Sequence, residues 1–458
     1  MGTIAEQLAV FADELTYDSI PEEVRRRAKH LILDGTGVAL ASSTYDFAAN
    51  TVNALATLGT GDGHVIGFSR RLPLRDAVLA NGSLIHGLDF DDTHLLGTVH
   101  GTSSCWPTAL GVAVREKKSG KDLLTAYVLG METAARLGAV AKGEFVQLGF
   151  HPTGMIAAFG CALIAGKLMG LDREQLTMAQ AIVLSMAAGA REYSSDASGI
   201  KRVHPGWAGT CGITAAVLAK GGVTGPRTAY EGRFGLYATH LRPEVVTPDL
   251  PAATRDFGKV WEILQVAIKP FPVGQLNIAF IDASITLATE HAIAPDDIAS
   301  IEMLVPPHAV KVVCEPVEMR RHPPNSYGAQ FGLQYQIACC LIHRKFGLAE
   351  LDRYREPQIL ALADKVNYRL DENTGYPKTW SGEVIVTLKN GQRLVRREQS
   401  NRGSSANPLP ERDIVGKFTG NALLAVAQAR AEEIRDAILD LDGNAGVHGL
   451  ADKLTLPA

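Results

Sequence analysis

The stretch GMIAAFGCALIAGKLMGL, residues 154–171, consists almost entirely of small and apolar residues. It is too short and too rich in glycine and alanine to cross a lipid bilayer. A second stretch of the same kind, ITAAVLAKGGVTGP, covers residues 213–226. Small side chains let neighbouring helices approach closely. The two stretches therefore predict helices inside a tightly packed helical core.

Helical patterns also fill the chain before and between these stretches. The segment 17–42, YDSIPEEVRRRAKHLILDGTGVALAS, has a proline and acidic residues where its first turn would lie, which favours a helix N-terminus. The apolar residues of 120–138, GKDLLTAYVLGMETAARLG, recur at helical spacing. We therefore expect residues 1–265 to form helix after helix.

The pattern changes near residue 266. Residues 298–306, IASIEMLVP, predict a strand, and residues 382–399, GEVIVTLKNGQRLVRREQ, predict a hairpin. Its turn contains Asn390 and Gly391, which we expect to be the two residues of positive φ between alternating strands.

Helical patterns separate these strands in SYGAQFGLQYQIACCLI and EPQILALADKV, and they return from about residue 407. The predicted fold class is mostly α. A large all-helical domain, residues 1–265, is completed by C-terminal helices at 405–458, and a smaller α+β lid domain, residues 266–404, is inserted between them.

Composition excludes several classes of function. The chain has 458 residues and a net charge of −4, so no global field attracts nucleic acid or an acidic membrane. Six cysteines form no CxxC pair and lie mostly in apolar runs, which favours buried thiols in a cytoplasmic protein. The N-terminus has acidic residues where a signal peptide needs basic ones.

The segment HGLDFDDTHLLGTVHG, residues 86–101, contains three aspartates and three histidines. If one helix covered 76–92, His86, Asp89 and Thr93 would share its polar side. Buried carboxylates and imidazoles are costly unless they are paired or used. The cluster could be a structural hydrogen-bond network, a metal site or an acid–base site that includes His100. Because no HExxH or comparable ligand spacing is present, acid–base chemistry is favoured over metal binding.

Four further segments each contain a candidate site residue. His151 precedes a small-residue helix and could be only a cap, and Tyr335 lies in an apolar helix and could be only a core residue. Lys201 and His204 are one helical turn apart, where a solvated basic turn is the alternative. Lys269 lies in a proline-stiffened segment at the expected domain junction, where substrate sites are common. The glycine-rich segment 59–68 follows a helix rather than a strand, so it does not predict nucleotide binding.

The segments ANGSLIHGLDFDDTH, GFHPTG, SGIKRVHPGWAG, IKPFPVGQLNIAFIDA and AQFGLQYQIA resemble, in order and spacing, the MmgE/PrpD family. That family includes 2-methylcitrate dehydratase, cis-aconitate decarboxylase and iminodisuccinate epimerase. The resemblance implies a homodimer of a helical domain plus a lid domain, with a cofactor-free site between them. The motifs that match contain these site residues: Asp89, Thr93, His100, His151, Lys201, Lys269 and Tyr335.

The resemblance also implies the chemistry, which is the formation or quenching of a carbanion beside a carboxylate. Lys201, His204, Lys269 and Thr93 would bind a small polycarboxylate, and no metal or other cofactor would be needed. His100 and His151 would act as base and acid, assisted by Asp89 and Tyr335. We expect a lyase that dehydrates a 2-methylcitrate-like hydroxy polycarboxylate. An isomerase or epimerase, a decarboxylase and a non-catalytic scaffold of the same fold are the alternatives.

Overall fold

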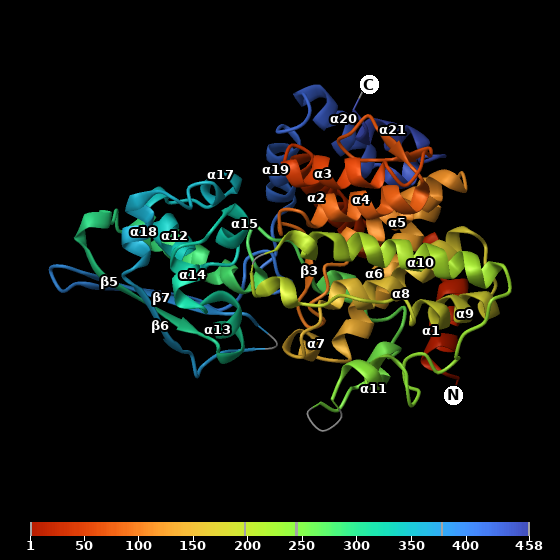
Figure 1. Cartoon of the computed structure of the whole chain (residues 1–458), viewed down its shortest axis with the longest axis horizontal. Coiled ribbons are helices and arrows are strands. Elements are labelled where there is room, and N and C mark those ends of the chain that lie inside the picture. Colours follow the sequence, from red (N-terminus) through yellow and green to blue (C-terminus); the bar gives the residue numbers. More distant parts are fainter. Residues whose placement is uncertain (1, 197, 243–245, 377–378, 457–458) are drawn as a thin grey trace.

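The computed structural model describes residues 2–196, 198–242, 246–376 and 379–456, and it is mostly α (Figure 1). Two main hydrophobic cores form. The larger contains residues from the first 268 positions together with residues 409–454, and the smaller contains residues 271–394. We call the two regions around these cores the helical part and the α+β part. This division agrees with the helical and α+β segments expected from the sequence, while the domain boundaries and the lid role stay predictions.

The helical part contains eleven α-helices before residue 266 within the described residues, besides short 3-10 helices such as Gly199–Val203. They are α1 (Ile4–Glu14), α2 (Glu22–Ser42), α3 (Asp46–Leu55), α4 (Leu74–His86), α5 (Thr102–Arg115), α6 (Gly120–Ala139), α7 (Glu144–Gln147), α8 (Pro152–Leu168), α9 (Arg173–Val183), α10 (His204–Lys220) and α11 (Leu236–His240). Two short ladders also lie here, β1 (Gly63–His64) with β2 (Arg71–Leu72), and β3 (Thr93–His94) with β4 (Val266–Ala267).

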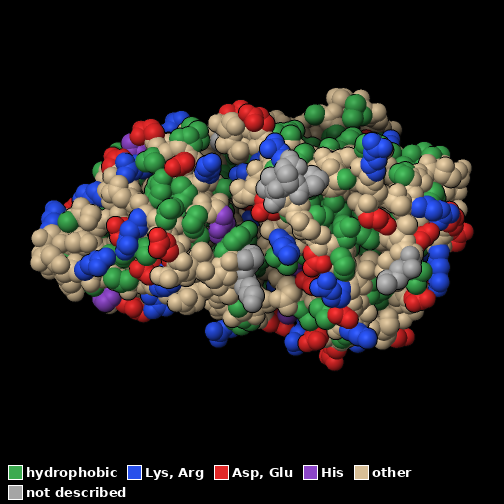
Figure 2. All heavy atoms as spheres, turned by 90° about the horizontal axis from the view of Figure 1, so that it is seen from below, with side chains coloured by type: hydrophobic (Ala, Val, Ile, Leu, Met, Phe, Trp, Pro, Cys, Tyr) green, Lys and Arg blue, Asp and Glu red, His purple; other side chains and the backbone are tan. Residues whose placement is uncertain are grey.

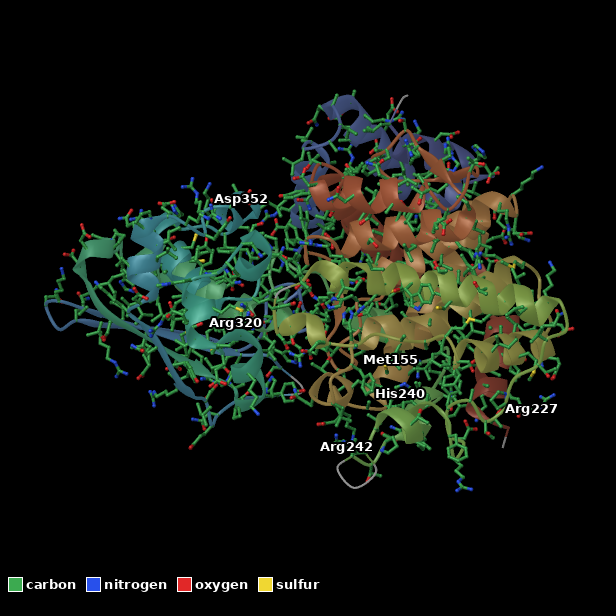
Figure 3. The ribbon with its side chains drawn as sticks, viewed as in Figure 1. Met155, Arg227, His240, Arg242, Arg320 and Asp352 are labelled. Atoms are coloured by element: carbon green, nitrogen blue, oxygen red, sulfur yellow. The ribbon has the colours of Figure 1, made fainter. Side chains whose placement is uncertain are left out.

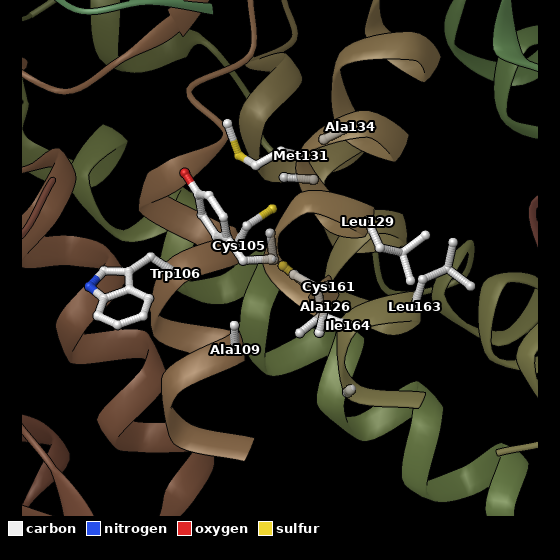
Figure 4. Packing of buried hydrophobic residues seen from close by; sticks show 14 of the residues in the cluster. Cys105, Trp106, Ala109, Ala126, Leu129, Met131, Ala134, Cys161, Leu163 and Ile164 are labelled. Carbon is white, nitrogen blue, oxygen red and sulfur yellow. The ribbon is translucent and has the colours of Figure 1, made fainter. Parts of the chain in front are cut away.

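The small-residue stretches form α8 and α10, which pack against each other at the centre of this part. A Cβ atom on Gly212 of α10 would lie 2.5 Å from the Cβ of Cys161, and one on Gly160 would lie 2.6 Å from the carbonyl oxygen of Gly130. Figure 4 shows the neighbouring packing of Cys105 from α5, Ala126 from α6, and Cys161 and Ile164 from α8. The expectation of a tight helical core is confirmed, because the backbones approach where side chains are absent.

The α+β part combines seven α-helices with one sheet in its described residues. The helices are α12 (Ile278–Glu290), α13 (Pro307–Val313), α14 (Val317–Arg321), α15 (Ser326–Ala329), α16 (Leu333–His343), α17 (Leu348–Leu351) and α18 (Pro357–Ala363). The strands are β5 (Ile298–Val305), β6 (Val366–Leu370), β7 (Gly382–Leu388) and β8 (Arg393–Glu398), in the order β6-β5-β7-β8. Helices α12 and α16 pack on this sheet and bury its apolar residues.

The hairpin of β7 and β8 is present, but its turn differs from the expected one. Only Gly391 has a positive φ (+86°); Asn390 does not. The Gly391 N–H donates to the carbonyl of Leu388, and the Leu388 N–H donates to that of Gln392. A three-residue loop ending in a left-handed glycine therefore replaces the two-residue turn. Strand β6 was not expected, because its residues VNYRL form a strand only beside the parallel β5.

The C-terminal helices α19 (Glu411–Ala422), α20 (Gln428–Leu439) and α21 (His448–Leu454) return to the helical part, and α19 packs along α2. The Lys417 ammonium lies 2.7 Å from Asp34 Oδ1 and donates to the carbonyl of Phe90. Phe418 is fully buried against Gly37, where a Cβ would lie 3.0 Å from the Phe418 Cα. The tail is thus part of the larger core.

All six cysteines are buried and free, as the sequence indicated. Among the described residues, the helices are all too short or too polar to cross a bilayer. On the face in Figure 2, basic and acidic side chains are interspersed over both parts of the molecule.

The contact of Phe418 with α2 makes a stability prediction. We expect Phe418→Ala to lower the free energy of unfolding by about 3–5 kcal/mol, because it leaves a cavity in the larger core. Urea denaturation measures this change. Leu424→Ala is the matched control, since Leu424 is 53% exposed and should cost under about 0.5 kcal/mol. Equal effects of the two substitutions would contradict the packing role of the tail.

Candidate active site

A cavity of about 520 Å³ opens between the helical part and the α+β part. Six of the eight predicted site residues line it: Asp89, Thr93, His100, His151, Lys201 and Lys269. They come from segments that are far apart in the sequence, and the fold brings them together. His204 and Tyr335 are not among the lining residues.

The loop after α4 contains the aspartates, and it differs from the expected helix over 76–92. Helix α4 ends at His86, and Asp89 has a φ of +48°. A left-handed backbone is unusual outside glycine, although aspartate tolerates it better than most residues. Gly87, which follows the helix with a backbone that is still helical, packs closely against Phe47, where a Cβ would lie 2.4 Å from the ring. His86, Asp89 and Thr93 therefore meet through a loop and not along one helix face.

A two-residue ladder brings Thr93 and Lys269 together. In β3 and β4, Thr93 pairs with Ala267 and His94 pairs with Val266 in antiparallel register. Lys269 follows β4 by two residues and is fully buried. The proline-stiffened KPFP segment thus leaves the helical part directly beside the aspartate loop.

Asp89 lies between the two lysines. The Lys201 Nζ donates to Asp89 Oδ1 at 2.9 Å, and the Lys269 Nζ donates to the same oxygen and to the Asp89 carbonyl, both at 2.8 Å. Burial opposes ionisation of Asp89, but the two ammonium groups hold its pKa well below its usual value. Its Oδ2 has no hydrogen-bond partner among the described residues. Two positive charges thus share one carboxylate and keep donors for a further anion.

His100 is oriented as a neutral base. Its Nδ1 lies 2.8 Å from the carbonyl of Asp92 and 3.1 Å from the hydroxyl of Thr93. Because a carbonyl only accepts, Nδ1 carries the proton and Nε2 keeps its lone pair. Burial, with further contributions from Lys269 and Lys201, lowers the pKa of His100 to about 3 although Asp91 opposes the shift. The imidazole is therefore uncharged at neutral pH.

Two other histidines, His86 and His151, lie beside His100, and His204 lies beside His151. The Nδ1 of His86 lies 2.8 Å from Asp91 Oδ2, with both side chains fully buried, and the His86 ring centroid is 4.8 Å from that of His100. His151 Nδ1 lies 3.1 Å from His204 Nδ1. Burial lowers the pKa of His86, His151 and His204, and the charge of Lys201 lowers all three further, although Asp91 opposes the shift of His86. His204 thus contacts a site residue rather than the cavity.

Comparison with known proteins identifies the family. The profile described as the MmgE/PrpD N-terminal domain matches residues 6–248, and that of the MmgE/PrpD C-terminal domain matches residues 271–442. The chain belongs to the MmgE/PrpD family. The resemblance expected from the five sequence segments is confirmed.

Curated relatives match almost the whole chain. A cis-aconitate decarboxylase-like protein of Aspergillus oryzae is 26% identical, over 98% of this chain and 96% of its own length. The cis-aconitate decarboxylase of Mus musculus is 28% identical, over 96% and 91% of the two chains. The cis-aconitate decarboxylase of Aspergillus terreus is 24% identical, over 99% and 96%. The MmgE/PrpD chain is therefore similar to enzymes along its full length.

Tyr335 does not reach the cavity. It is fully buried in the smaller core, and its hydroxyl donates to the carbonyl of Glu350 at 2.6 Å. Tyr335 is therefore a core residue, which was the alternative to a site residue in the sequence analysis. A different tyrosine of the α+β part, Tyr327, lines the cavity beside Phe331, and its buried hydroxyl has no partner in the described residues.

Sequence reasoning missed several residues of the site. His86 and Asp91 were in view as part of the aspartate cluster, but nothing in their spacing predicted that they pair. Tyr327, Arg191 and Arg320 also line the cavity. They lie in short loops and helices without a motif, so only their tertiary positions reveal them.

Several histidine and aspartate side chains of the site lie close enough together to bind one metal ion. Ligand atoms of His86, His100 and His151 lie within 4.8 Å of one another, and so do those of His86, Asp89, Asp91 and His100. Two features oppose a resident cation. The ammonium groups of Lys201 and Lys269 would repel it, and they already occupy Asp89. The geometry favours an anion in this MmgE/PrpD site.

The buried histidines make a pH prediction. On unfolding, the pKa of His151 returns to about 6.5, so the unfolded chain binds a proton that the folded chain does not. Stability from this residue is therefore lost as pH falls below about 6.5. Relative to wild type, His151→Gln should gain up to about 1.4 kcal/mol in unfolding free energy per pH unit between pH 6.5 and 5.

Urea denaturation at several pH values measures that difference. Titrating groups that lie away from His151 contribute equally to both proteins, so their effects cancel. His291→Gln, at an exposed position, is the control and should show no such trend. A difference between wild type and His151→Gln that does not change with pH would refute the neutral buried state of His151.

Proposed function

We propose that this protein is a lyase that forms a carbanion next to a carboxylate of a small tricarboxylate, by decarboxylation of a cis-aconitate-like substrate. The observation that carries the proposal is the charge of the cavity. Five lining residues are cationic (Arg191, Lys201, Lys269, Lys311 and Arg320) and two are acidic (Asp89 and Glu315). With neutral histidines the described lining has an excess of three positive charges, which matches a tricarboxylate.

The lysines and histidines have separate roles in this proposal. Lys201 and Lys269 bind a substrate carboxylate and stabilise the negative charge that grows next to it. In a site that excludes water, one such donor contributes about 3–4 kcal/mol to transition-state stabilisation. Asp89 keeps both ammonium groups aimed at the same point. Substrate anions raise the pKa of His100 and His151, so these side chains exchange protons nearer to neutral pH.

For a cis-aconitate-like substrate, the bond between carbon and the departing carboxylate breaks and CO₂ leaves. The electron pair moves through the double bond to the carbon beside another carboxylate, where a proton is added. His100 or His151 delivers that proton and regains one from solvent. Dehydration of a 2-methylcitrate-like substrate, first expected from the sequence, would use the same groups to remove a proton and protonate the departing hydroxyl. The decarboxylase names of the relatives favour the first reaction.

A substrate panel tests the proposal. The purified protein is incubated in D₂O with cis-aconitate, 2-methylcitrate and related hydroxy acids, and products are followed by NMR together with CO₂ release. We expect CO₂ and one deuterium in the product from cis-aconitate. A new alkene without CO₂ would show dehydration, and deuterium exchange with inversion would show epimerisation. If no polycarboxylate is turned over, the lyase proposal is wrong and the alternative of a non-catalytic scaffold is favoured.

The histidines make the second part of the test. His100→Ala and His151→Ala should each lower kcat by about 10²–10⁴-fold, the usual contribution of a general acid or base. His240→Ala is the control, because His240 lies outside the cavity. Near wild-type turnover by both cavity variants, with unchanged melting, would show that the acid–base assignment is wrong.

We also expect activity to survive removal of divalent metals, because two buried lysines occupy the place beside the histidines that a cation would need. Dialysis against EDTA should leave kcat within about twofold of the untreated protein. Loss of activity that a divalent ion restores would contradict this expectation. The homodimer and the movement of a lid stay proposals based on the family resemblance.

A further inference from the structure

Two arginines from opposite sides of the cavity have no carboxylate partner within the described part of the chain. Arg191 follows α9 in the helical part, and Arg320 lies in α14 of the α+β part, where Figure 3 labels it. Each spends one donor on the backbone. Arg191 Nη1 donates to the carbonyl of Val146 at 3.0 Å, and Arg320 Nε donates to that of Glu315 at 3.1 Å. Both side chains line the cavity.

The other N–H groups of Arg191 and Arg320 face no carboxylate among the described residues, which is unusual for a buried guanidinium. Arg320 is only 6% exposed, and a buried guanidinium without a counter-ion is costly. Both guanidinium groups face the same cavity of about 520 Å³, so their like charges repel each other. Burial lowers the pKa of Arg320, and the positive charge of Arg191 lowers it further. Lys201 and Lys269 differ from this pair, because both contact the carboxylate of Asp89 as a shared counter-ion. An anion between the arginines would remove the repulsion.

We propose that Arg191 and Arg320 form a second carboxylate-binding site, which holds the substrate carboxylate farthest from the reacting carbon. The inference rests on the proposed function, and it adds the residues that select the substrate. A guanidinium presents its N–H groups as a planar fork, which matches a carboxylate in two parallel hydrogen bonds. With the lysines at one site and the arginines at the other, a tricarboxylate engages both sites.

Two consequences follow from this position. The pair discriminates a tricarboxylate from a dicarboxylate of similar shape, because the smaller anion leaves the arginines uncompensated. The two arginines also belong to different parts of the molecule. A carboxylate bound by both therefore links the helical part to the α+β part across the cavity.

The test measures binding with two anions that cannot react. Propane-1,2,3-tricarboxylate has three carboxylates, and methylsuccinate has the same frame with a methyl group in place of one carboxymethyl group. Calorimetric titration of the wild-type protein should show about 10- to 100-fold tighter binding of the tricarboxylate, the range for hydrogen bonds to charged groups. Arg320→Gln and Arg191→Gln should each remove most of that difference and leave the affinity for methylsuccinate within about twofold.

Arg321→Gln is the matched control. Arg321 is the next residue of α14, but it donates to Val366 and Asn367 and does not line the cavity. It should keep full discrimination. Arg320→Lys should retain only part of it, because an ammonium lacks the fork. Melting temperatures confirm that each variant is folded.

The outcomes separate this inference from the proposed function. If the wild type binds the tricarboxylate tightly and both glutamine variants keep the preference over methylsuccinate, the arginine site is refuted and the lyase proposal stands. If the variants lose affinity for both anions to the same extent, the arginine site is also refuted, because the loss then reflects only the lower positive charge of the cavity. If the wild type binds neither anion, the proposed function itself fails.

Discussion

The shared carboxylate of Asp89 is the interaction on which the site depends. Two lysine ammonium groups, both buried, contact one oxygen of this side chain. Burying unpaired charges would cost several kcal/mol each, so the three groups are stable only together. They come from the loop after α4, from the short helix Gly199–Val203 and from the segment after β4. Their pairing fixes three distant segments at one point, and it supports the left-handed backbone of Asp89.

Burial sets the state of the histidines, and the charges around them modify it. Asp89 is shared by two lysines, while the buried carboxylate of Asp91 faces His86 and His100 and opposes the shift of His100. Burial, to which the charge of Lys201 adds, keeps His100 and His151 neutral at physiological pH. Neutral imidazoles next to two ammonium groups that share one carboxylate form a site that suits an anion. An incoming carboxylate then changes the proton affinity of the same imidazoles that would act on it.

The rest of the fold serves this arrangement. The close contact of α8 and α10 is possible because glycine and alanine face each other, and it places His151 beside His204 at the start of these two helices. The returning tail contributes Lys417, which holds the carbonyl of Phe90 between the site aspartates. Arg320 and Tyr327 reach the cavity from the α+β part, so the site is complete only where both parts meet.

The sequence alone predicted much of this. Alternation and helical spacing are local properties, and they identified the helical core, strand β5, the hairpin and the return of helix at the tail. Five motifs identified the family and six residues that line the cavity.

What the sequence could not give depends on neighbours distant in the chain. Strand β6 forms only beside β5, Tyr335 turned out to be a core residue while Tyr327 faces the cavity, and the helix expected over 76–92 ends at His86. The pairing of His86 with Asp91, the two lysines on one carboxylate and the two uncompensated arginines were decided by tertiary structure, because burial and charge separation exist only once the chain is folded.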